Sequence, residues 1–505
     1  MYLGLDCSTQ SLTAVIINAE TGAIAYQTSI NFEADLPQYQ TRHGFVRGTE
    51  PDEFFSNPLM WIEALDLLFE RMQQEGAPLS SVKAISGAAQ QHGTVYLNHN
   101  FKRALAQLSP NIPLTEQFTD VFSRPVAPIW LDASTHIACG EIAHAIGGHR
   151  KAAFRTGSSV TPRFSAAQIR KHAQQFPERW AETETVHLVS SFMASILAGK
   201  SVAIDYGDGA GMNLMHIKDR CWDQKMADIT ADHTIERLPA LAPTTDICGT
   251  ISPYFSEKYG INPAAKCAHW TGDNPASLVG MGVVHAGNWV ISLGTSYTLF
   301  AAVDSPFPDP QGYGHIFGNP IGGYMSLSCF KNGALSCVTL KNKLDISWAE
   351  FEKDLLTPRS EQSDVTLPFY ETEITPLASS VDQPTTTPSS HVDGQFLNMR
   401  LHCQWHGETP ETIVVTGGIS VSTGICQALA NVFQRPVQRL QTSSSASLGA
   451  AIIAAYADAQ NIDSLIDHFC HPIEGTTIEP DPAMEKIYQV LGNKFNDKLY
   501  KHLME

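Results

Sequence analysis

Residues 2–17 read YLGLDCSTQSLTAVII, and this stretch decides the fold class. Residues 2–5 and 13–17 are rich in apolar and β-branched side chains, and the polar turn between them begins DCSTQ. This pattern predicts a β-hairpin. The small side chains of the turn would let backbone N–H groups and hydroxyls approach a phosphate, with an ordinary surface turn as the alternative.

A second stretch repeats this pattern more than half the chain away. Residues 289–303 read WVISLGTSYTLFAAV, an apolar strand, a turn of Gly, Ser and Thr, and a returning strand. Alignment of the two sets Asp6 against Gly294 and Ser8 against Ser296. The repeat predicts two domains of related topology that each present a small-residue loop to a shared cleft. Because the match is short and such hairpins are common, chance similarity is the alternative.

The length of the chain also predicts two domains, because a single core stops growing near ~250 to 300 residues and this chain has 505. A helix is expected after Asn57, which caps it, with Pro58 at its first position. Strands at residues 82–86 and 94–97 flank the turn GAAQQHG. Strands that alternate with covering helices indicate the α/β class.

We place the domain boundary near residue 246, where the pattern breaks. This gives an N-terminal domain at residues 1–246 and a C-terminal domain at residues 247–480. Residues 481–505 are expected to form a closing helix, capped by Asp481, that packs back on the body. The Pro, Ser and Thr rich residues 379–390 are expected to form an exposed loop or insertion.

The composition limits the partners. Apolar residues make up 43% and charged residues 17%, as in a globular protein, and the formal net charge is -18. That charge argues against a nucleic-acid partner, which Lys and Arg would have to bind. Ten scattered cysteines, no C-x-x-C pair, no signal peptide and no long apolar run favour a cytoplasmic protein that spans no membrane.

The stretch WTGDNPAS at residues 270–277 holds a lone carboxylate, Asp273. Gly272 lets the chain turn, Asn274 is expected to cap the next helix, and Pro275 suits its first position. Asp273 would then lie just outside a helix N-terminus, where a carboxylate stays ionised at neutral pH. It is a candidate general base that takes a proton from an attacking hydroxyl, and a second helix cap is the alternative.

Two further groups of residues are candidates for ligand binding. Gln90, Gln91 and His92 form a cluster of neutral donors and acceptors suited to a sugar, and Arg163 adds a charged donor. Each also has an ordinary structural or surface role as its alternative. The stretch VVTGGISVSTGI at residues 414–425 places a Gly-Gly pair at a strand-to-helix turn, which admits a flat ring or a phosphate or is simply a compact turn. The Ser and Thr residues after this pair are expected to cap the helix that follows.

Taken together, these motifs resemble the FGGY family of carbohydrate kinases, and within it the branch of animal D-xylulose kinases. The similarity covers most of the chain, in the stretches LGLDCSTQSL, LMWIEALD, ISGAAQQHGTVYL, PIWLDAST, VSSFMASIL, IDYGDGAGMNL, TGDNPASLVGMG, VISLGTSYTLF, GHIFGNP, CFKNGAL, EITP and VVTGGIS. Two features depart from that branch. Ser422 stands where the branch has Asn, and residues 363–376 lack the glycine-rich stretch expected before the aromatic pair. Ser134 follows the branch's own variant of a motif in which the broader family favours Arg.

The resemblance implies an α/β fold of two ribonuclease H-like domains, as in actin-like ATPases and sugar kinases, that flank a cleft. It implies a sugar-binding N-terminal domain and a nucleotide-binding C-terminal domain that carries the catalytic base. The implied reaction is ATP-dependent phosphorylation of the 5-hydroxyl of D-xylulose, with Mg²⁺. Alternatives are another substrate of the family, such as ribulose, gluconate or glycerol, and a sugar or nucleotide sensor without transfer activity. A homodimer is one expectation for the assembly.

The resemblance also implies residue roles. Asp273 would be the base, and Asp6 would hold Mg²⁺ through water. The residues implied to contact the sugar are His92, Arg163, Asp273 and Asn274, and Gln91 joins them from the polar turn. The residues implied to hold the nucleotide or its phosphates are Ser8, Thr9, Gln10, Gly294, Thr295, Trp348, Gly417, Gly418, Ile419 and Ser422.

Overall fold

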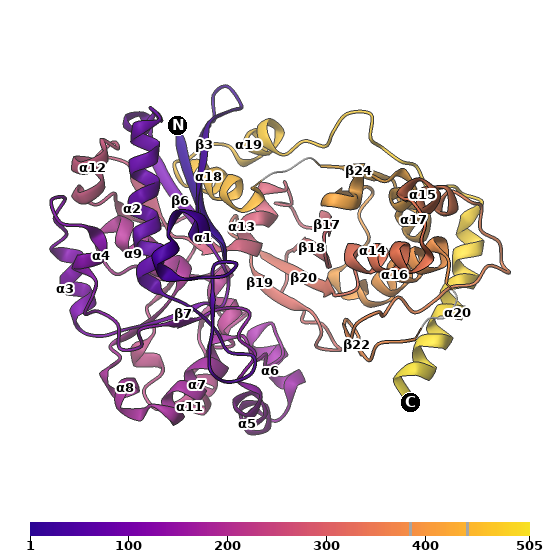
Figure 1. The fold of residues 1–505 in the computed structure, drawn as a ribbon, viewed down its shortest axis with the longest axis horizontal. Coiled ribbons are helices and arrows are strands. Elements are labelled where there is room, and N and C mark those ends of the chain that lie inside the picture. The colour runs from indigo at the N-terminus through magenta and orange to yellow at the C-terminus, as the bar shows by residue number, and fades with distance from the viewer. Residues whose placement is uncertain (383–385, 441–443, 505) are drawn as a thin grey trace.

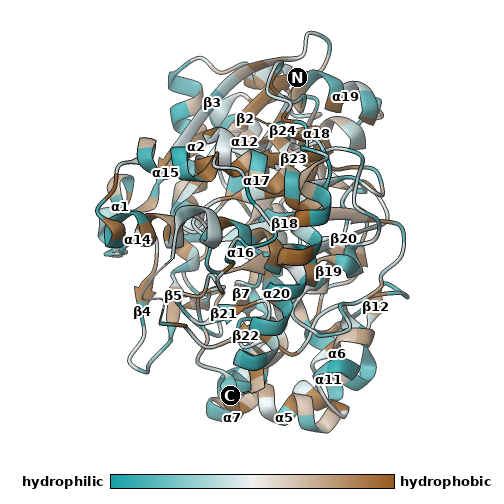
Figure 2. Cartoon of the chain, turned by 90° about the vertical axis from the view of Figure 1, so that its right-hand side faces the viewer, coloured by the Kyte–Doolittle hydropathy of each residue, from teal (hydrophilic) through white to brown (hydrophobic). Residues whose placement is uncertain are grey.

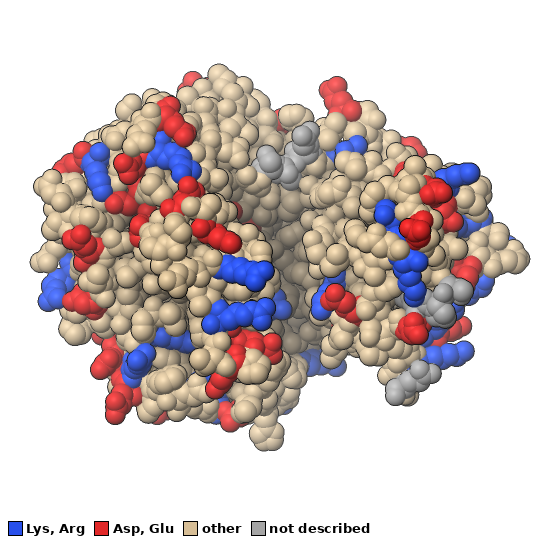
Figure 3. Space-filling model, in the orientation of Figure 1, with Lys and Arg blue, Asp and Glu red and all other residues tan. Residues whose placement is uncertain are grey.

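The computed structural model describes residues 1–382, 386–440 and 444–504. The chain forms two lobes, with the N-terminal half in indigo to magenta and most of the C-terminal half in orange and yellow (Figure 1). A groove separates the two lobes on the face drawn in Figure 3. Within the described residues, no helix is both long and apolar enough to cross a membrane.

The first lobe is built on a sheet with the strand order β14-β15-β6-β1-β2-β3, and β16 also pairs with β6. β1 pairs with β2 in antiparallel fashion and with β6 in parallel, so the hairpin predicted at residues 2–17 is confirmed. The strands are β1 (Tyr2–Cys7), β2 (Ser11–Asn18), β3 (Ala23–Asn31), β6 (Ala84–Ala89), β14 (Ile247–Thr250), β15 (Lys266–Ala268) and β16 (Thr271–Gly272).

The second lobe repeats this topology in a sheet of order β19-β20-β18-β17-β23-β24. β17 pairs antiparallel with β18 and parallel with β23, as β1 does with β2 and β6. The internal repeat predicted from the two hairpins is therefore confirmed. The strands are β17 (Trp289–Leu293), β18 (Tyr297–Val303), β19 (His315–Gly318), β20 (Tyr324–Phe330), β23 (Ile413–Thr416) and β24 (Val437–Arg439).

The first sheet does not end at the boundary predicted at residue 246. β14, β15 and β16 all follow that residue and pair within the first sheet, which runs on to Gly272. The alternation along the chain could not show this, because strand partners are chosen by packing between distant segments. The change of lobe falls after α13 (Asp273–Gly280) and before β17.

A helix from near the end of the chain also joins the first lobe. α18 (Ser445–Ala457), drawn in yellow, lies beside the indigo strands in Figure 1. A Cβ on Gly4 of β1 would lie 2.1 Å from the Ser447 carbonyl oxygen, so only glycine permits this approach. α13 crosses α18 just as closely, because a Cβ on Gly280 would lie 2.0 Å from the Ser445 carbonyl oxygen.

The helices cover both sheets. Asn57 caps α2 as predicted, and its Oδ1 accepts from the Leu59 N–H at 2.9 Å. The main helices of the first lobe are α2 (Pro58–Gln74), α3 (Asn100–Ala106), α5 (His136–Ile146), α6 (His149–Thr156), α7 (Ser165–Gln175), α8 (Pro177–Glu182), α9 (Val189–Ala198), α11 (Gln224–Thr230) and α12 (Pro253–Tyr259). Those of the second are α14 (Ala334–Leu344), α15 (Trp348–Leu355), α16 (Pro388–His402), α17 (Thr423–Phe433) and α20 (Met484–Met504), while α19 (Ile462–Phe469) follows α18.

Shorter elements complete the chain. The short helices are α1 (Phe32–Asp35), α4 (Leu114–Gln117) and α10 (Tyr206–Gly209). The short strands are β4 (Val46–Arg47), β5 (Phe54–Ser56), β7 (Thr94–Leu97), β8 (Ala127–Pro128), β9 (Thr185–Leu188), β10 (Ile204–Asp205), β11 (Met215–His216), β12 (Cys221–Trp222), β13 (Leu241–Ala242), β21 (Glu373–Ile374) and β22 (Leu377–Ala378).

Two predictions at the end of the chain need correction. The loop expected at residues 379–390 is shorter, because Thr387 caps α16 and the helix already begins at Pro388; residues 383–385 lie outside the described part. The closing helix begins at Met484, and Asp481 is not its cap, contrary to the prediction. The Asp481 Oδ1 accepts from the Ala483 N–H in a turn that precedes the helix. Tyr488 and Phe495 of α20 are buried in the second core, and Figure 2 shows mainly hydrophilic residues on its outer face.

Candidate active site

Asp273 is the first residue of α13, directly after β16. The helix cap is Gly272, and not Asn274 as predicted, so Pro275 becomes the third helical residue. The Asp273 Oδ1 accepts from the Asn274 backbone N–H at 2.9 Å and from its side-chain Nδ2 at 3.1 Å. Asp273 thus pairs with an N–H of the first turn, and Asn274 holds its carboxylate in place.

Asp273 and Asp6 approach each other across one strand. Asp6 in β1 lies opposite Ala88 of β6, and Thr271 of β16 lies opposite the same residue. Burial raises the pKa of Asp273 to about 6, so the carboxylate is mostly ionised at neutral pH. Burial and then the charge of Asp273 raise the pKa of Asp6 to about 8. The Asp6 Oδ1 is buried and has no hydrogen-bond partner in the described part of the chain.

This arrangement fits a hard cation. A buried carboxylate oxygen without a donor, beside a second carboxylate, is electrostatically costly, and a divalent cation or its bound water would satisfy it. Such a cation would also favour the ionised form of Asp6. The residue type and its surroundings therefore agree with the Mg²⁺ expected from the sequence.

The polar turn after β6 contacts the same helix start. The Gln91 Oε1 accepts from the Asn274 Nδ2 at 2.8 Å. His92 donates from Nδ1 to the Gly211 carbonyl oxygen at 2.9 Å, which leaves Nε2 as an acceptor, and its ring stacks on Phe164 at 4.2 Å. Burial and then Arg163 hold the pKa of His92 well below its usual range, so the ring is neutral.

Arg163 lies on the exposed side of this cluster, just before α7. Its guanidinium is 5.9 Å from the ring centroid of Trp130, and the Trp130 Nε1 donates to the Thr9 Oγ1 at 2.8 Å. Trp130 therefore connects the candidate sugar residue Arg163 with the turn at residues 8–10. That turn lies between β1 and β2, closed by a 2.9 Å hydrogen bond from the Ser8 N–H to the Ser11 carbonyl oxygen.

The candidate nucleotide residues lie on the second lobe. The carbonyl oxygens of Gly294 and Thr295 accept from the Ala334 and Leu335 N–H groups at the start of α14. Gly417 follows β23 with φ 98°, and a Cβ there would lie 2.5 Å from the Leu293 carbonyl oxygen. The Gly417–Gly418 turn is thus packed against the strand that carries the Gly294 turn.

Ser422 is hydrogen-bonded to the helix that begins at Trp348. Ser422 caps α17, accepting from the Ile425 N–H at 3.1 Å, and donates to the Glu352 Oε2 at 2.5 Å. Glu352 belongs to α15, whose first residue, Trp348, is exposed. The expectation that a Ser or Thr residue after Gly418 caps the next helix is therefore confirmed for Ser422, which also gives this residue a structural role.

Two residues next to the sugar-side cluster were not predicted. Asp208 is buried in α10, accepts from the Ser190 hydroxyl at 2.5 Å, and has its pKa raised by burial and by Asp205 and Asp273. His315 in β19 of the second lobe lies 5.5 Å from Phe164, and burial with the charge of Arg163 lowers its pKa to about 4. Asp208 lies in the stretch IDYGDGAGMNL and His315 in the stretch GHIFGNP. In each, a polar ionisable residue between glycines was the sequence signal that could have identified it.

Comparison with known proteins agrees with this geometry. Residues 114–280 match the N-terminal domain and residues 289–457 the C-terminal domain of the FGGY family of carbohydrate kinases. The chain is 37% identical to the xylulose kinase of Mus musculus, over 98% of this chain and 93% of that protein. It is 35% identical to xylulose kinase 2 of Arabidopsis thaliana, over 90% and 87%.

Solved structures have the same fold. The crystal structure of xylulose kinase from Rhodospirillum rubrum aligns with a TM-score of 0.84 at 19% identity, covering 100% of this chain and 99% of that one. Such low identity indicates the shared fold alone. The family matches and the nearly full-length relatives settle the membership: this chain belongs to the FGGY family of carbohydrate kinases.

Proposed function

We propose that this protein transfers the γ-phosphoryl group of ATP to the 5-hydroxyl of D-xylulose. The observation that carries the proposal is the half-buried Asp273 at the start of α13, whose pKa is raised to about 6 and which lies beside Asp6 and the Gln91 and His92 turn. A base with this pKa is ionised at neutral pH and still basic enough to accept a hydroxyl proton. The names of the mouse and Arabidopsis relatives favour D-xylulose as the sugar.

The reaction would use each group as follows. Asp273 takes the proton from the 5-hydroxyl as that oxygen bonds to the γ-phosphorus, and the bond from phosphorus to the ADP oxygen breaks. The His92 Nε2 accepts a hydrogen bond from a sugar hydroxyl, and Arg163 donates to a sugar oxygen. The Asn274 Oδ1 accepts from another sugar hydroxyl, because both of its Nδ2 donors already bind Gln91 and Asp273. Asn274 also keeps the Asp273 carboxylate aimed at the hydroxyl.

The phosphate groups would lie between the two lobes. The turns at residues 8–10 and 294–296 offer N–H groups and hydroxyls to the phosphates, and Trp348, Gly417 to Ile419 and Ser422 lie along the nucleotide. Asp6 would hold Mg²⁺ through water, and this ion offsets charge on the phosphates. Closure of the lobes would exclude water and so prevent futile ATP hydrolysis.

A panel of phosphate acceptors tests the proposal. ADP release would be measured with D-xylulose, D-ribulose, D-gluconate and glycerol at equal concentrations. We expect the highest kcat/KM with D-xylulose. A clear preference for another acceptor would replace the substrate, and no ADP release with any acceptor would favour a sensor without transfer activity.

A further inference from the structure

A cavity lies in the first lobe, outside the candidate active site. It has a volume of about 340 Å³ and is lined by side chains from the segments 49–55, 124–126 and 171–179. None of the residues assigned above to sugar, nucleotide or metal lines it. Its volume lies at the lower end of the range for small-molecule sites.

The charges of this cavity are mainly positive. Arg124, Lys171 and Arg179 line it together with Glu50 and Glu53. Both carboxylates pair with Lys171, at 3.3 and 2.8 Å, which leaves a surplus of one positive charge in a chain of net charge -18. A local surplus of this sign attracts an anion.

Two of the three cations have no carboxylate partner within ion-pair distance among the described residues. Arg124 lies over the ring of Tyr96 at 5.2 Å, and after Lys171 its charge contributes to the lowered pKa of Glu53. Arg179 is exposed and lies over the ring of Phe176 at 5.7 Å. Their guanidinium groups can therefore donate to a bound anion, and Arg favours phosphate because its planar donors match phosphate oxygens.

A buried imidazole completes the cavity wall. His172 of α7 is 2% exposed, and neither of its ring nitrogens has a hydrogen-bond partner in the described part of the chain. Burial and then Arg124 and Arg179 lower its pKa to about 3, so the ring is neutral and keeps one N–H donor. A buried donor without a partner is costly, and a bound oxyanion would satisfy it.

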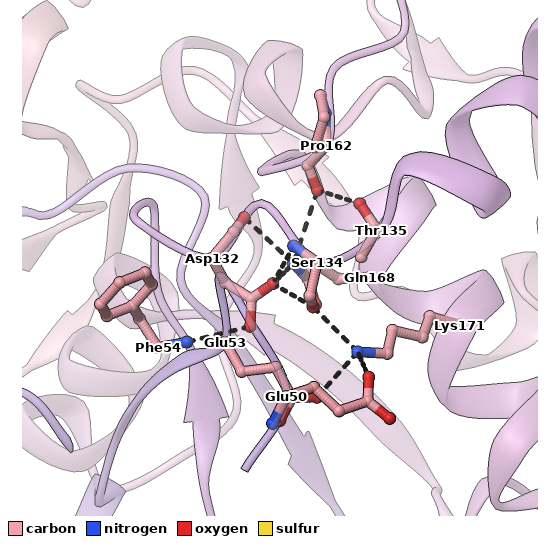
Figure 4. Close-up of polar contacts among 9 residues, drawn as sticks. All are labelled: Glu50, Glu53, Phe54, Asp132, Ser134, Thr135, Pro162, Gln168 and Lys171. Atoms are coloured by element: carbon pink, nitrogen blue, oxygen red, sulfur yellow. Dashed lines mark hydrogen bonds and ion pairs between the residues drawn. The ribbon is translucent and has the colours of Figure 1, made fainter. Parts of the chain in front are cut away.

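The third cation is held in position by a polar network. The Lys171 Nζ donates to the Ser134 Oγ at 2.9 Å, and Ser134 in turn donates to the Asp132 Oδ1 at 2.7 Å (Figure 4). Gln168 of α7 donates to the same Asp132 oxygen at 2.9 Å. A cation held by several acceptors loses little freedom when a ligand binds.

We infer that this cavity binds a small phosphorylated anion between Arg124 and Arg179, with a donor from His172. The rings of Phe55 and Phe176 also line it, each with one face under a guanidinium group, Arg124 at 5.4 Å and Arg179 at 5.7 Å. Apolar ring surface for the carbon chain of a sugar phosphate therefore lies directly beside the two cations. The ligand is thus either free phosphate or a phosphorylated sugar. Both carry the same group, and two probes distinguish them.

Calorimetric titration of the full chain with inorganic phosphate and with ribose 5-phosphate tests the inference. We expect both probes to bind, ribose 5-phosphate more tightly if the aromatic faces contribute. Arg179→Gln should weaken binding of each probe by ~10-fold or more, the effect of losing a charge-assisted hydrogen bond. Arg124→Gln combined with Arg179→Gln should abolish binding at this cavity.

Arg150→Gln is the matched control, because Arg150 is also an exposed arginine over a phenylalanine ring, at 5.6 Å from Phe154. It should leave both affinities unchanged. Binding of phosphates in the active-site cleft is common to all these variants, so only the difference between them reports on the cavity. Equal affinity of the double variant and the unaltered chain, or no binding of either probe, would overturn the inference.

Discussion

The two hairpin turns have the same topology and different chemistry. The first turn follows β1, whose last residues include Asp6 with its carboxyl group, while the second follows β17 and has Gly294 at the position equivalent to Asp6. The first is closed by its own Ser8 to Ser11 hydrogen bond, and the second is held through α14. The two hairpins therefore share a backbone topology and carry different kinds of side chain. The first lobe holds the acidic groups, and the second offers small neutral residues where phosphates would lie.

The largest expected effect on activity comes from a change to the acidic groups of the first lobe. Asp273→Asn keeps the shape of the side chain and removes the base, so we expect kcat to fall by ~10²- to 10⁴-fold. A coupled ADP assay with D-xylulose measures this. Asp304→Asn, at an exposed position after β18, is the control and should retain full activity. A rate for Asp273→Asn within a few-fold of the unaltered chain would refute the base assignment.

The small neutral residues of the second lobe can be tested with two neighbouring glycines. Gly417 has φ 98° and no room for a Cβ, whereas a Cβ on Gly418 meets nothing within 4 Å. Gly417→Ala should therefore lower the free energy of unfolding by about 2 kcal/mol or more. Gly418→Ala should leave it unchanged and instead weaken ATP binding. Thermal unfolding and nucleotide titration separate these effects, and equal stability of both variants would contradict the packing argument.

The pH dependence sharpens the assignment of Asp273. Its pKa is raised to about 6, and only the ionised form can accept a proton. We expect kcat/KM to be constant above that pH and to fall tenfold per unit below it. Circular dichroism at each pH would show that the chain stays folded. Activity that persists undiminished at pH 5 would exclude a base with this pKa.

The smallest effect concerns Ser422, the cap of α17. Ser422→Ala removes the hydrogen bonds to the Ile425 N–H and to Glu352, so we expect a loss of about 1 kcal/mol in denaturant unfolding. Ser422→Asn is the matched variant, because Asn caps helices equally well and should preserve stability. An unchanged free energy of unfolding for Ser422→Ala would contradict a stabilising role of this cap.

Local features were predictable from local sequence. Asn57 and Pro58 marked the start of α2, and runs of apolar and β-branched residues on either side of a polar turn marked both hairpins, because these signals act within a few residues. In the structure, Gln91 of the polar turn contacts Asn274 at the helix start, and the sugar-binding roles of Gln91, His92 and Asn274 stay predictions. The cap of α13 was wrong, since the choice between Gly272 and Asn274 depends on the direction in which β16 enters the helix.

The amino-acid sequence by itself determined the α/β class, the repeated hairpins and the residue types of the candidate site. Only the tertiary structure decided that β14 to β16 join the first sheet and that α18 packs on Gly4, because both depend on contacts between distant segments. The same packing brings Asp6 and Asp273, both half-buried, to opposite sides of one strand. Burial raises the pKa of both carboxyls, and no pattern in the sequence carries that information.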